Sequence, residues 1–241
     1  MQVDVGIIGG TGVGDRLLKL GGKPLFVPTS AGMLRGRLID HKGASILVVS
    51  RHSAGHKVPP HHVNYAAMAL GLKAVGVKAC LASAAVGSLR REWKPGTLVA
   101  CSDFVDLTFR NLTLFDQNVV HTDFSTPFSE TGRAAMLAAN PNLVDGGVYV
   151  CLNGPRYETP TEIKFYETMG GDLVGMTAAS EAILMREAGI EYATLAIVTN
   201  LASGYEDEPL SHEEVVAEMN RSGEAATQTL LAAAVSLATN T

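Results

Sequence analysis

Leu81-Ala-Ser-Ala-Ala-Val-Gly-Ser-Leu89 is the stretch around which the rest of the chain is organised. Residues from Val77 to Ala85 are almost all small or apolar, which predicts a strand buried on both faces. Gly87-Ser88 is expected to break that strand and open a turn. Ligands of open α/β sheets bind beyond the carboxyl ends of such strands. We therefore expect a binding site next to Gly87.

Three other segments are expected to end strands at the same edge of the sheet, namely Gly9-Gly10-Thr11-Gly12, Arg51-His52 and Met176-Thr177. They offer backbone N–H groups, two hydroxyls, a guanidinium and an imidazole, which together suit a bound anion. The glycine segment lacks a Walker lysine and GxGxxG spacing, so a simple tight turn explains it equally well. Taken alone, Arg51 and His52 would be better explained as a surface arginine and a loop histidine.

Apolar runs elsewhere predict strands that alternate with helices. Strands are expected at 3–8, 46–50, 98–102, 147–152, 173–176 and 192–199, and helices at 61–75, 128–139, 161–169, 180–188 and 211–238. Residues 103–123 are expected to form a long surface excursion. The alternation predicts an α/β fold, and no repeat, linker or change in composition divides residues 1–241, so a single domain is expected.

Composition narrows the classes of function. The chain has 241 residues, is 46% hydrophobic and carries a net charge of -5, so no basic face is suggested and nucleic acid is not an expected partner. No signal peptide or membrane-spanning run is apparent, which favours a soluble protein. Cys80, Cys101 and Cys151 lack CxxC spacing, which argues against a disulfide framework and a zinc site. Buried thiols in a reducing cytoplasm are the expectation.

Six segments in order carry a resemblance to a known family. They are Gly9 to Gly12, Arg51-His52 with Val63-Asn64-Tyr65, Ala85 to Ser88, Gly154-Pro155-Arg156-Tyr157-Glu158-Thr159, Gly175-Met176-Thr177 with Glu181, and Thr199-Asn200. From residue 5 to about residue 220 the chain resembles the trimeric purine nucleoside phosphorylase and methylthioadenosine phosphorylase family. No single motif is specific, but six in this order are strongly so.

The resemblance implies a single-domain α/β fold with a mixed, partly barrel-like central sheet flanked by helices. It implies a homotrimer whose active sites lie near subunit interfaces. The implied reaction is reversible phosphorolysis, in which a purine nucleoside and phosphate give free purine and a ribose 1-phosphate. Inorganic phosphate is the co-substrate, and no metal or organic cofactor is implied.

The resemblance also assigns roles to individual residues. The phosphate cradle is implied to consist of Thr11, Arg51, His52, the backbone of Ala85, and Thr177. Met176 is implied to pack on the ribose and Tyr157 against the base, and the implied catalytic residues are Asn200, Glu158 and His52. His121 resembles a histidine that a neighbouring subunit lends to the 5′ pocket, although its position alone indicates a solvated loop residue.

Glu158 and Asn200 bear on the choice of base. Adenine-specific relatives typically have a small polar residue and an aspartate at these two places, whereas 6-oxopurine phosphorylases have Glu and Asn. An ionised carboxylate only accepts hydrogen bonds, so Glu158 suits the N1–H of a 6-oxopurine, and the Asn200 amide can donate to O6 or N7. With adenine, an unpaired buried group would cost roughly 1–3 kcal/mol. Without the resemblance, a helix cap at Glu158 and a strand end at Asn200 would be the better explanation.

The 5′ substituent is harder to predict. His212 resembles the histidine of inosine-guanosine phosphorylases that meets the 5′-hydroxyl, where methylthio-specific members have an apolar residue. The chain length, Arg51-His52 and Val63-Asn64-Tyr65 instead resemble the methylthioadenosine branch, some bacterial members of which accept methylthioinosine. The alternatives are therefore inosine, guanosine or 5′-methylthioinosine as substrate, with 5′-methylthioadenosine as the runner-up.

Two other classes remain as rivals. A nucleosidase that uses water would not need Arg51-His52 and two hydroxyl residues to hold phosphate. A non-catalytic purine-binding domain would keep the Gly9 loop but need not keep Glu158, Thr177 and Asn200 together. A dinucleotide-binding dehydrogenase is disfavoured because GxGxxG is absent.

Overall fold

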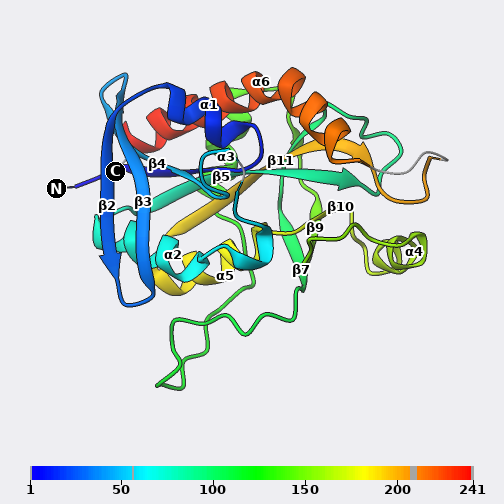
Figure 1. Cartoon of the computed structure of the whole chain (residues 1–241), viewed down its shortest axis with the longest axis horizontal. Coiled ribbons are helices and arrows are strands. Elements are labelled where there is room, and N and C mark those ends of the chain that lie inside the picture. Colours follow the sequence, from blue (N-terminus) through cyan, green and yellow to red (C-terminus); the bar gives the residue numbers. More distant parts are fainter. Residues whose placement is uncertain (1, 56, 207–210, 240–241) are drawn as a thin grey trace.

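Strand β5 (Ala79–Ser88) lies at the centre of the sheet, and its small side chains allow it to be covered on both faces. The computed structural model describes residues 2–55, 57–206 and 211–239. Figure 1 shows β5 crossing the molecule between two layers of helices. The strand continues through Gly87 and Ser88 rather than breaking there, so the expected turn begins later.

The described elements alternate along the chain much as the apolar runs predict. The helices are α1 (Val13–Lys19), α2 (Tyr65–Ala74), α3 (Glu130–Ala139), α4 (Pro160–Thr168), α5 (Ala178–Ala188) and α6 (His212–Thr239), with a 3-10 turn at Pro60–His62. The other strands are β1 (Val5–Gly9), β2 (Lys23–Thr29), β3 (Gly32–His41), β4 (Ala44–Ser50), β6 (Leu98–Ala100), β7 (Asp103–Leu107), β8 (Val144–Asp145), β9 (Val148–Leu152), β10 (Leu173–Gly175) and β11 (Glu191–Leu201).

Pairing around β5 brings several strand ends together. Strand β1 is parallel to both β4 and β5, and β11 is parallel to β5 along the whole of its length. The carboxyl ends of β1, β4, β5 and β11 therefore lie at one edge of the sheet. Strand β10 is antiparallel to the end of β5, with Leu173 opposite Ser88, and is parallel to β9. These pairings bring the segments that follow six strands close to the end of β5. The six strands are β1, β4, β5, β9, β10 and β11.

Helices cover both faces of the sheet. Helices α1, α3 and α6 pack on one face, where Leu81 of β5 contributes to the core. Helices α2 and α5 pack on the other face, where Cys80, Ala82 and Ala84 contribute. This alternation along β5 follows from the two-residue period of a strand. In Figure 1, α4 stands apart from both layers.

Several expectations from sequence need correction. The mixed sheet flanked by helices is confirmed, but the described strands form an open sheet with β2 at one end of its main path and β7 at the other, and the sheet does not close into a barrel. Strand β7 occupies the beginning of the expected surface excursion, and the β2–β3 hairpin and α1 lie in a stretch for which no element was predicted. Helix α4 begins at Pro160, one residue earlier than predicted, because Thr159 is its N-cap.

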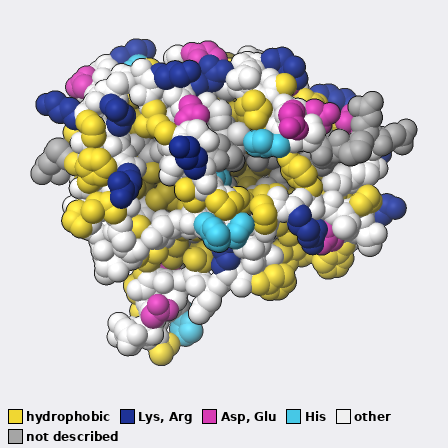
Figure 2. Space-filling view, in the orientation of Figure 1, with side chains coloured by type: hydrophobic (Ala, Val, Ile, Leu, Met, Phe, Trp, Pro, Cys, Tyr) yellow, Lys and Arg dark blue, Asp and Glu magenta, His cyan; other side chains and the backbone are white. Residues whose placement is uncertain are grey.

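Beyond β7, the chain leaves the body of the molecule before it returns to α3 (Figure 1). Arg186 of α5 holds this projecting segment, residues 109–127, by donating to the carbonyls of Asp123 and Thr126. Glu187 accepts hydrogen bonds from Thr113 and Leu114 of the same segment. None of the helices described is long and apolar enough to cross a membrane. On the face shown in Figure 2, Lys and Arg are interspersed with Asp and Glu.

Candidate active site

A cavity of about 430 Å³ lies at the carboxyl end of β5, a volume suited to a small organic ligand. Figure 2 shows hydrophobic and histidine side chains around a hollow in the same molecule. Ten of the eleven residues predicted for the site line this cavity: Thr11, Arg51, His52, Ala85, Tyr157, Glu158, Met176, Thr177, Asn200 and His212. The cavity lies where open α/β sheets bind their ligands.

His121 is the predicted site residue that the structure does not bring to this cavity. It is exposed and lies in the projecting segment between β7 and α3. His121 therefore does not contribute to the cavity of its own chain.

Arg51 directly follows β4, and its guanidinium is buried with its charge already balanced. Nε and Nη2 donate to the two carboxylate oxygens of Glu181 at 2.5 and 2.7 Å, and Nη1 donates to the Ser83 carbonyl at 2.8 Å. Burial lowers the pKa of Arg51, but the nearby Glu181 carboxylate outweighs it and the pKa is raised overall. Three of its five N–H groups are thus used within the protein, and one N–H on each terminal nitrogen is left for a ligand.

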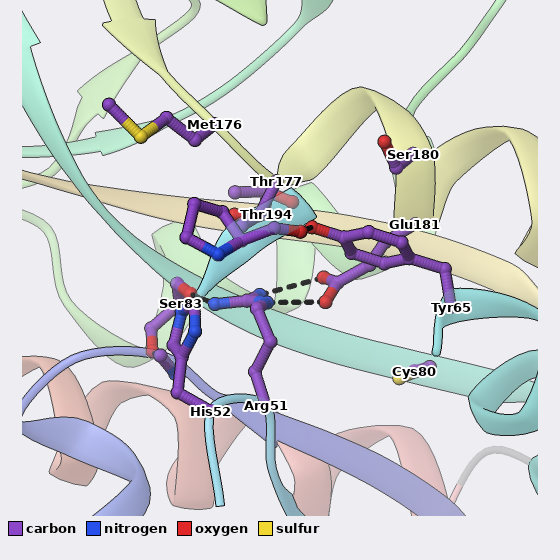
Figure 3. A network of polar contacts seen from close by, with 12 residues as sticks. Arg51, His52, Tyr65, Cys80, Ser83, Met176, Thr177, Ser180, Glu181 and Thr194 are labelled. Carbon is purple, nitrogen blue, oxygen red and sulfur yellow. Dashed lines mark hydrogen bonds and ion pairs between the residues drawn. The ribbon is translucent and has the colours of Figure 1, made fainter. Parts of the chain in front are cut away.

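Glu181 is the centre of a buried network that the sequence analysis did not assign to the site (Figure 3). Besides Arg51, it accepts a hydrogen bond from the Tyr192 hydroxyl at 2.6 Å, and Thr194 donates to Tyr192 at 2.8 Å. Glu181 is 1% exposed, and a buried carboxylate of this kind needs a cationic partner. Its place four residues after Thr177, on an otherwise apolar face of α5, was the signal that could have identified it.

Ser83 of β5 links the glycine segment to Arg51. Its hydroxyl accepts a hydrogen bond from the Gly10 backbone N–H at 2.9 Å, and its carbonyl accepts from Arg51. A Cβ atom at Gly10 would lie 2.5 Å from Arg51 Nη1, so the close approach of backbone and guanidinium requires glycine. The Gly9 to Gly12 segment is thus fixed against the site by packing, and Thr11 lines the cavity beside it.

Thr177 is the N-cap residue of α5, and its backbone N–H donates to the Tyr149 hydroxyl at 3.4 Å. The partial positive charge of a helix N-terminus favours an anion at this end of the cavity. His52 has a defined orientation because its Nδ1 lies 2.8 Å from the Val58 carbonyl. A carbonyl only accepts, so Nδ1 of the neutral imidazole carries the proton. Thr11, Arg51, His52 and Thr177 therefore form one polar end of the cavity.

Glu158 lies in the loop after β9 and is only 9% exposed. Burial raises the pKa of its carboxyl above the ordinary value, and a backbone hydrogen bond opposes that shift. Helix α4 is capped by Thr159 and Glu162, which exchange side-chain and backbone hydrogen bonds. Glu158 is therefore not the cap of this helix, and it lines the cavity instead.

Asn200 reaches the cavity because β11 is irregular there. The register against β5 shifts between Val198 and Asn200, which places Asn200 opposite Gly87. The Asn200 Oδ1 accepts from the Thr199 hydroxyl at 2.8 Å, and Nδ2 donates to the Leu201 carbonyl at 2.8 Å. These contacts fix the amide orientation and leave one N–H of Nδ2 to donate.

Met176 and His212 complete the wall. A Cβ at Gly154 would lie 2.4 Å from Met176 Sδ, so the loop after β9 packs directly on the turn before α5. His212 is the first residue of α6, whose N-terminus is fixed by reciprocal contacts between Ser211 and Glu214. His212 also lines a neighbouring cavity of about 270 Å³, together with Thr11 and His52.

No group of three or more His, Cys, Asp or Glu residues that could hold a metal ion occurs in the part of the chain that the structure describes. The three cysteines are free and buried. Burial raises the pKa of Cys101 and of Cys151 to about 12, and burial likewise raises that of Cys80. The polar groups of the residues that line the cavity are hydroxyls, amides, imidazoles, one guanidinium, one carboxylate and the ammonium of Lys57.

Comparisons with known proteins agree with this arrangement. The family described as the Phosphorylase superfamily matches residues 4–235. The chain is 43% identical to a probable 6-oxopurine nucleoside phosphorylase of Moorella thermoacetica, over 91% of this chain and 87% of that protein. It is 41% identical to a probable S-methyl-5′-thioinosine phosphorylase of Methanothermobacter thermautotrophicus, over 88% and 76% respectively. A methylthioadenosine phosphorylase from Schistosoma mansoni, solved in complex with adenine, superposes with a TM-score of 0.87 at 31% identity, over 97% and 91%.

Proposed function

Since the chain belongs to the phosphorylase superfamily, we propose that it catalyses the reversible phosphorolysis of purine nucleosides, with 6-oxopurine bases favoured. The substrates are a nucleoside and inorganic phosphate, and the products are free purine and a ribose 1-phosphate or its 5-methylthio form. One observation carries the proposal. A single cavity has an anion-binding end at Arg51, His52 and Thr177, and Asn200 and the buried Glu158 lie elsewhere in its wall.

Phosphate binds at the polar end in this proposal. The two remaining N–H groups of Arg51, the N-terminus of α5 at Thr177, the Thr11 hydroxyl, His52 and the Ala85 backbone form its cradle. Held there, phosphate attacks the anomeric carbon in a positioned rather than a bimolecular encounter. The phosphate dianion stabilises the positive charge that develops on the sugar as the glycosidic bond breaks. The reaction needs no metal or organic cofactor.

The purine leaves with the electron pair of the glycosidic bond, so it needs donors that strengthen as negative charge develops. Asn200 supplies the N–H that its own contacts leave available, directed to O6 or N7 of the base. Ionised Glu158 accepts from N1–H of a 6-oxopurine. Tyr157 packs against the base and Met176 against the ribose, and both line the cavity.

The 5′ end of the sugar is assigned to His212, which supports inosine and guanosine as substrates. Both alternatives occur among the related proteins, because a 6-oxopurine nucleoside phosphorylase and an S-methyl-5′-thioinosine phosphorylase match this chain at similar identity. Val215 lines the same cavity one turn further along α6, which gives an apolar neighbour that suits a methylthio group.

We further propose that the enzyme is a cytoplasmic homotrimer. The exposed position of His121 in the projecting segment supports its contribution to the 5′ pocket of a neighbouring subunit. The three free cysteines support a reducing compartment.

The test is the release of base from inosine, adenosine, 5′-methylthioinosine and 5′-methylthioadenosine, each with and without phosphate. We expect phosphate-dependent release that is faster from both hypoxanthine nucleosides. Release without phosphate would identify a hydrolase, and faster cleavage of methylthioadenosine would contradict the roles of Glu158 and Asn200. Purine binding in a calorimeter without any turnover would identify a binding domain.

A further inference from the structure

Arg110 stands where three neighbouring strands end. Strand β7 pairs with β9 up to Leu107 and Leu152, and β9 pairs with β10 up to Cys151 and Gly175. Beyond these pairs no backbone hydrogen bonds of the sheet join the three strands. The segments that follow them separate into the projecting segment, the loop that carries Glu158, and the turn that carries Met176.

The guanidinium of Arg110 points back between the two loops that line the cavity. Nε donates to Asn153 Oδ1 at 2.8 Å, and Nη2 donates to the Asn153 carbonyl at 2.9 Å. Nη1 donates to the Ser180 hydroxyl at 2.8 Å. Nη1 and Nη2 each lie 3.4 Å from the Met176 carbonyl. All five N–H groups of the guanidinium therefore have acceptors, and these belong to both loops and to α5.

Through Tyr65, Arg110 is also linked to Pro60 in another part of the cavity wall. The Arg110 Cζ lies 5.1 Å from the centre of the Tyr65 ring, within the range of a cation–π contact. The Tyr65 hydroxyl donates to the Pro60 carbonyl at 2.8 Å, and Pro60 lines the cavity. Arg110 itself does not line the cavity, so it contacts the wall from behind.

We propose that Arg110 is a positioning residue for the nucleoside part of the site. It holds the loop of Tyr157 and Glu158 and the turn of Met176 at a fixed separation, which preserves the distance between the base and the ribose contacts. The inference rests on the proposed function for its substrate. Lysine cannot replace it, because three donors on one nitrogen do not reach acceptors spread around a planar fork.

Most of the phosphate end is held by different contacts. Arg51 is fixed by Glu181 and Ser83, and none of these residues contacts Arg110 in the hydrogen bonds described. Loss of Arg110 is therefore expected to change recognition of the nucleoside more than recognition of phosphate, because Thr177, which follows Met176, is the cradle residue next to an Arg110 contact. A general loss of stability would not separate the two substrates in this way.

The test measures kcat and KM for inosine and for phosphate in the wild type and in Arg110→Ala and Arg110→Lys. We expect both variants to lose on the order of tenfold to a hundredfold in kcat/KM for inosine, as when a site is displaced by about 1 Å. The KM for phosphate is expected to rise less than the KM for inosine, because of the cradle residues only Thr177 lies next to an Arg110 contact. Ser180→Ala removes one acceptor only, and a smaller effect in the same direction is expected.

Arg37→Ala is the matched control, because Arg37 donates to the carbonyls of Gly21 and Gly22 before β2 and contacts neither the loop after β9 nor the turn before α5 in the hydrogen bonds described. An equal loss in Arg37→Ala, or an equal rise in both KM values in Arg110→Ala, would overturn the positioning role. Hydrogen exchange gives an answer that does not need activity: Arg110→Ala should exchange faster at 153–159 and 174–178 and unchanged at 9–14. An inactive wild type would refute the proposed function, while unchanged exchange at 153–159 would refute the role of Arg110.

Discussion

Burial raises the pKa of the Glu158 carboxyl above its ordinary value of 4.5, and this shift bears on which purine the site accepts. An ionised Glu158 accepts from the N1–H of a 6-oxopurine, whereas a protonated Glu158 can donate to the N1 of adenine. Because the pKa is raised, the protonated form persists to a higher pH than in an exposed glutamate. The preference between bases is therefore coupled to pH through a single side chain.

We expect the ratio of inosine to adenosine cleavage, taken as kcat/KM, to fall as pH falls through the raised pKa of Glu158. Carboxylate is lost in that direction, so inosine loses its acceptor while adenosine gains a donor. Parallel pH profiles for the two substrates measure the ratio. In Glu158→Gln the amide does not titrate, and the ratio should become independent of pH over the same range. Glu191→Gln, at the opposite end of β11 from Asn200, is the control and should retain the wild-type profile.

Tyr192 gives a second prediction for a single residue. Tyr192→Phe removes the donor to Glu181 and the acceptor of Thr194, which leaves buried groups unpaired. We expect a loss of about 1–3 kcal/mol in the free energy of unfolding, measured by urea denaturation. Since Glu181 orients Arg51, the KM for phosphate should rise more than the KM for inosine.

Tyr205→Phe is the comparison for that experiment. The single proton of the Tyr205 hydroxyl also has a carboxylate as acceptor, that of Glu167, with the Leu89 carbonyl as the alternative acceptor, and Tyr205 is remote from the Arg51–Glu181 pair in the network of hydrogen bonds. A rise in the phosphate KM of the same size in Tyr205→Phe would contradict the role of Tyr192.

At the level of elements, the start of α4 determines where Glu158 lies. Thr159 Oγ1 accepts from the Glu162 backbone N–H at 3.2 Å, and the Glu162 carboxylate accepts from the Thr159 N–H at 2.8 Å. Arg156 donates two further hydrogen bonds to Glu162. The Arg156 hydrogen bonds, and then that of Thr159, lower the pKa of Glu162 to about 2. Arg156 and Thr159 are therefore both fixed to Glu162, and Glu158 lies between them in the chain.

Thr159→Ala removes the capping hydroxyl and is expected to cost about 1 kcal/mol of stability, measured by thermal or chemical denaturation. Because Glu158 directly precedes the cap, the KM for inosine should rise in the same variant. Thr159→Ser keeps the hydroxyl and should restore both quantities. A stable Thr159→Ala variant with unaltered inosine kinetics would show that the cap does not position Glu158.

A contribution of Glu162 to stability has a defined dependence on pH. Its pKa is lowered in the folded chain, so the contribution is complete above the ordinary value of 4.5 and is lost as pH falls toward about 2. The side chain is partly exposed, and solvent screening keeps this contribution small.

How far the sequence predicts these features depends on the kind of signal. Buried strands and the helices that follow them have clear apolar patterns, so the region from β4 to α6 is largely as expected. The β2–β3 hairpin has mixed exposure on both strands and no such pattern. Thr11, Asn200 and Glu158 could be assigned from their resemblance to family motifs. Arg110 acts through contacts with residues far apart in the chain, which local patterns do not reveal. The position of Glu181 after Thr177 marks it as unusual but does not reveal its pairing with Arg51.

At the scale of the whole molecule, a third cavity, of about 560 Å³, lies between the end of β7 and α4. Phe109 at its border is 93% exposed and Phe165 is 57% exposed. Aromatic side chains around a concave surface are typical of a protein–protein contact. The cavity shares Glu158 with the candidate active site, so a neighbouring subunit at this surface would lie beside the base.

We expect light scattering after size exclusion to give three times the mass of one chain. Phe109→Asp places a charge on the contact surface and should shift the protein toward a smaller mass, with a higher KM for inosine. Leu20→Asp, at an exposed leucine just after α1, is the control and should leave the mass unchanged. A monomeric wild type, or an unaltered mass in Phe109→Asp, would argue against this surface as the subunit contact.

All three cysteines are buried, so the rate at which their thiols can be labelled reports opening of the sheet. Each thiol is covered on β5, after β6 or on β9, and a raised pKa keeps it in the unreactive protonated form. A thiol-specific dye should therefore not label the native enzyme within minutes, and activity should survive the reagent. The rate of Cys80 labelling then reports how often the central strand becomes exposed. A side chain without a role in catalysis thus measures the rate at which the native enzyme opens.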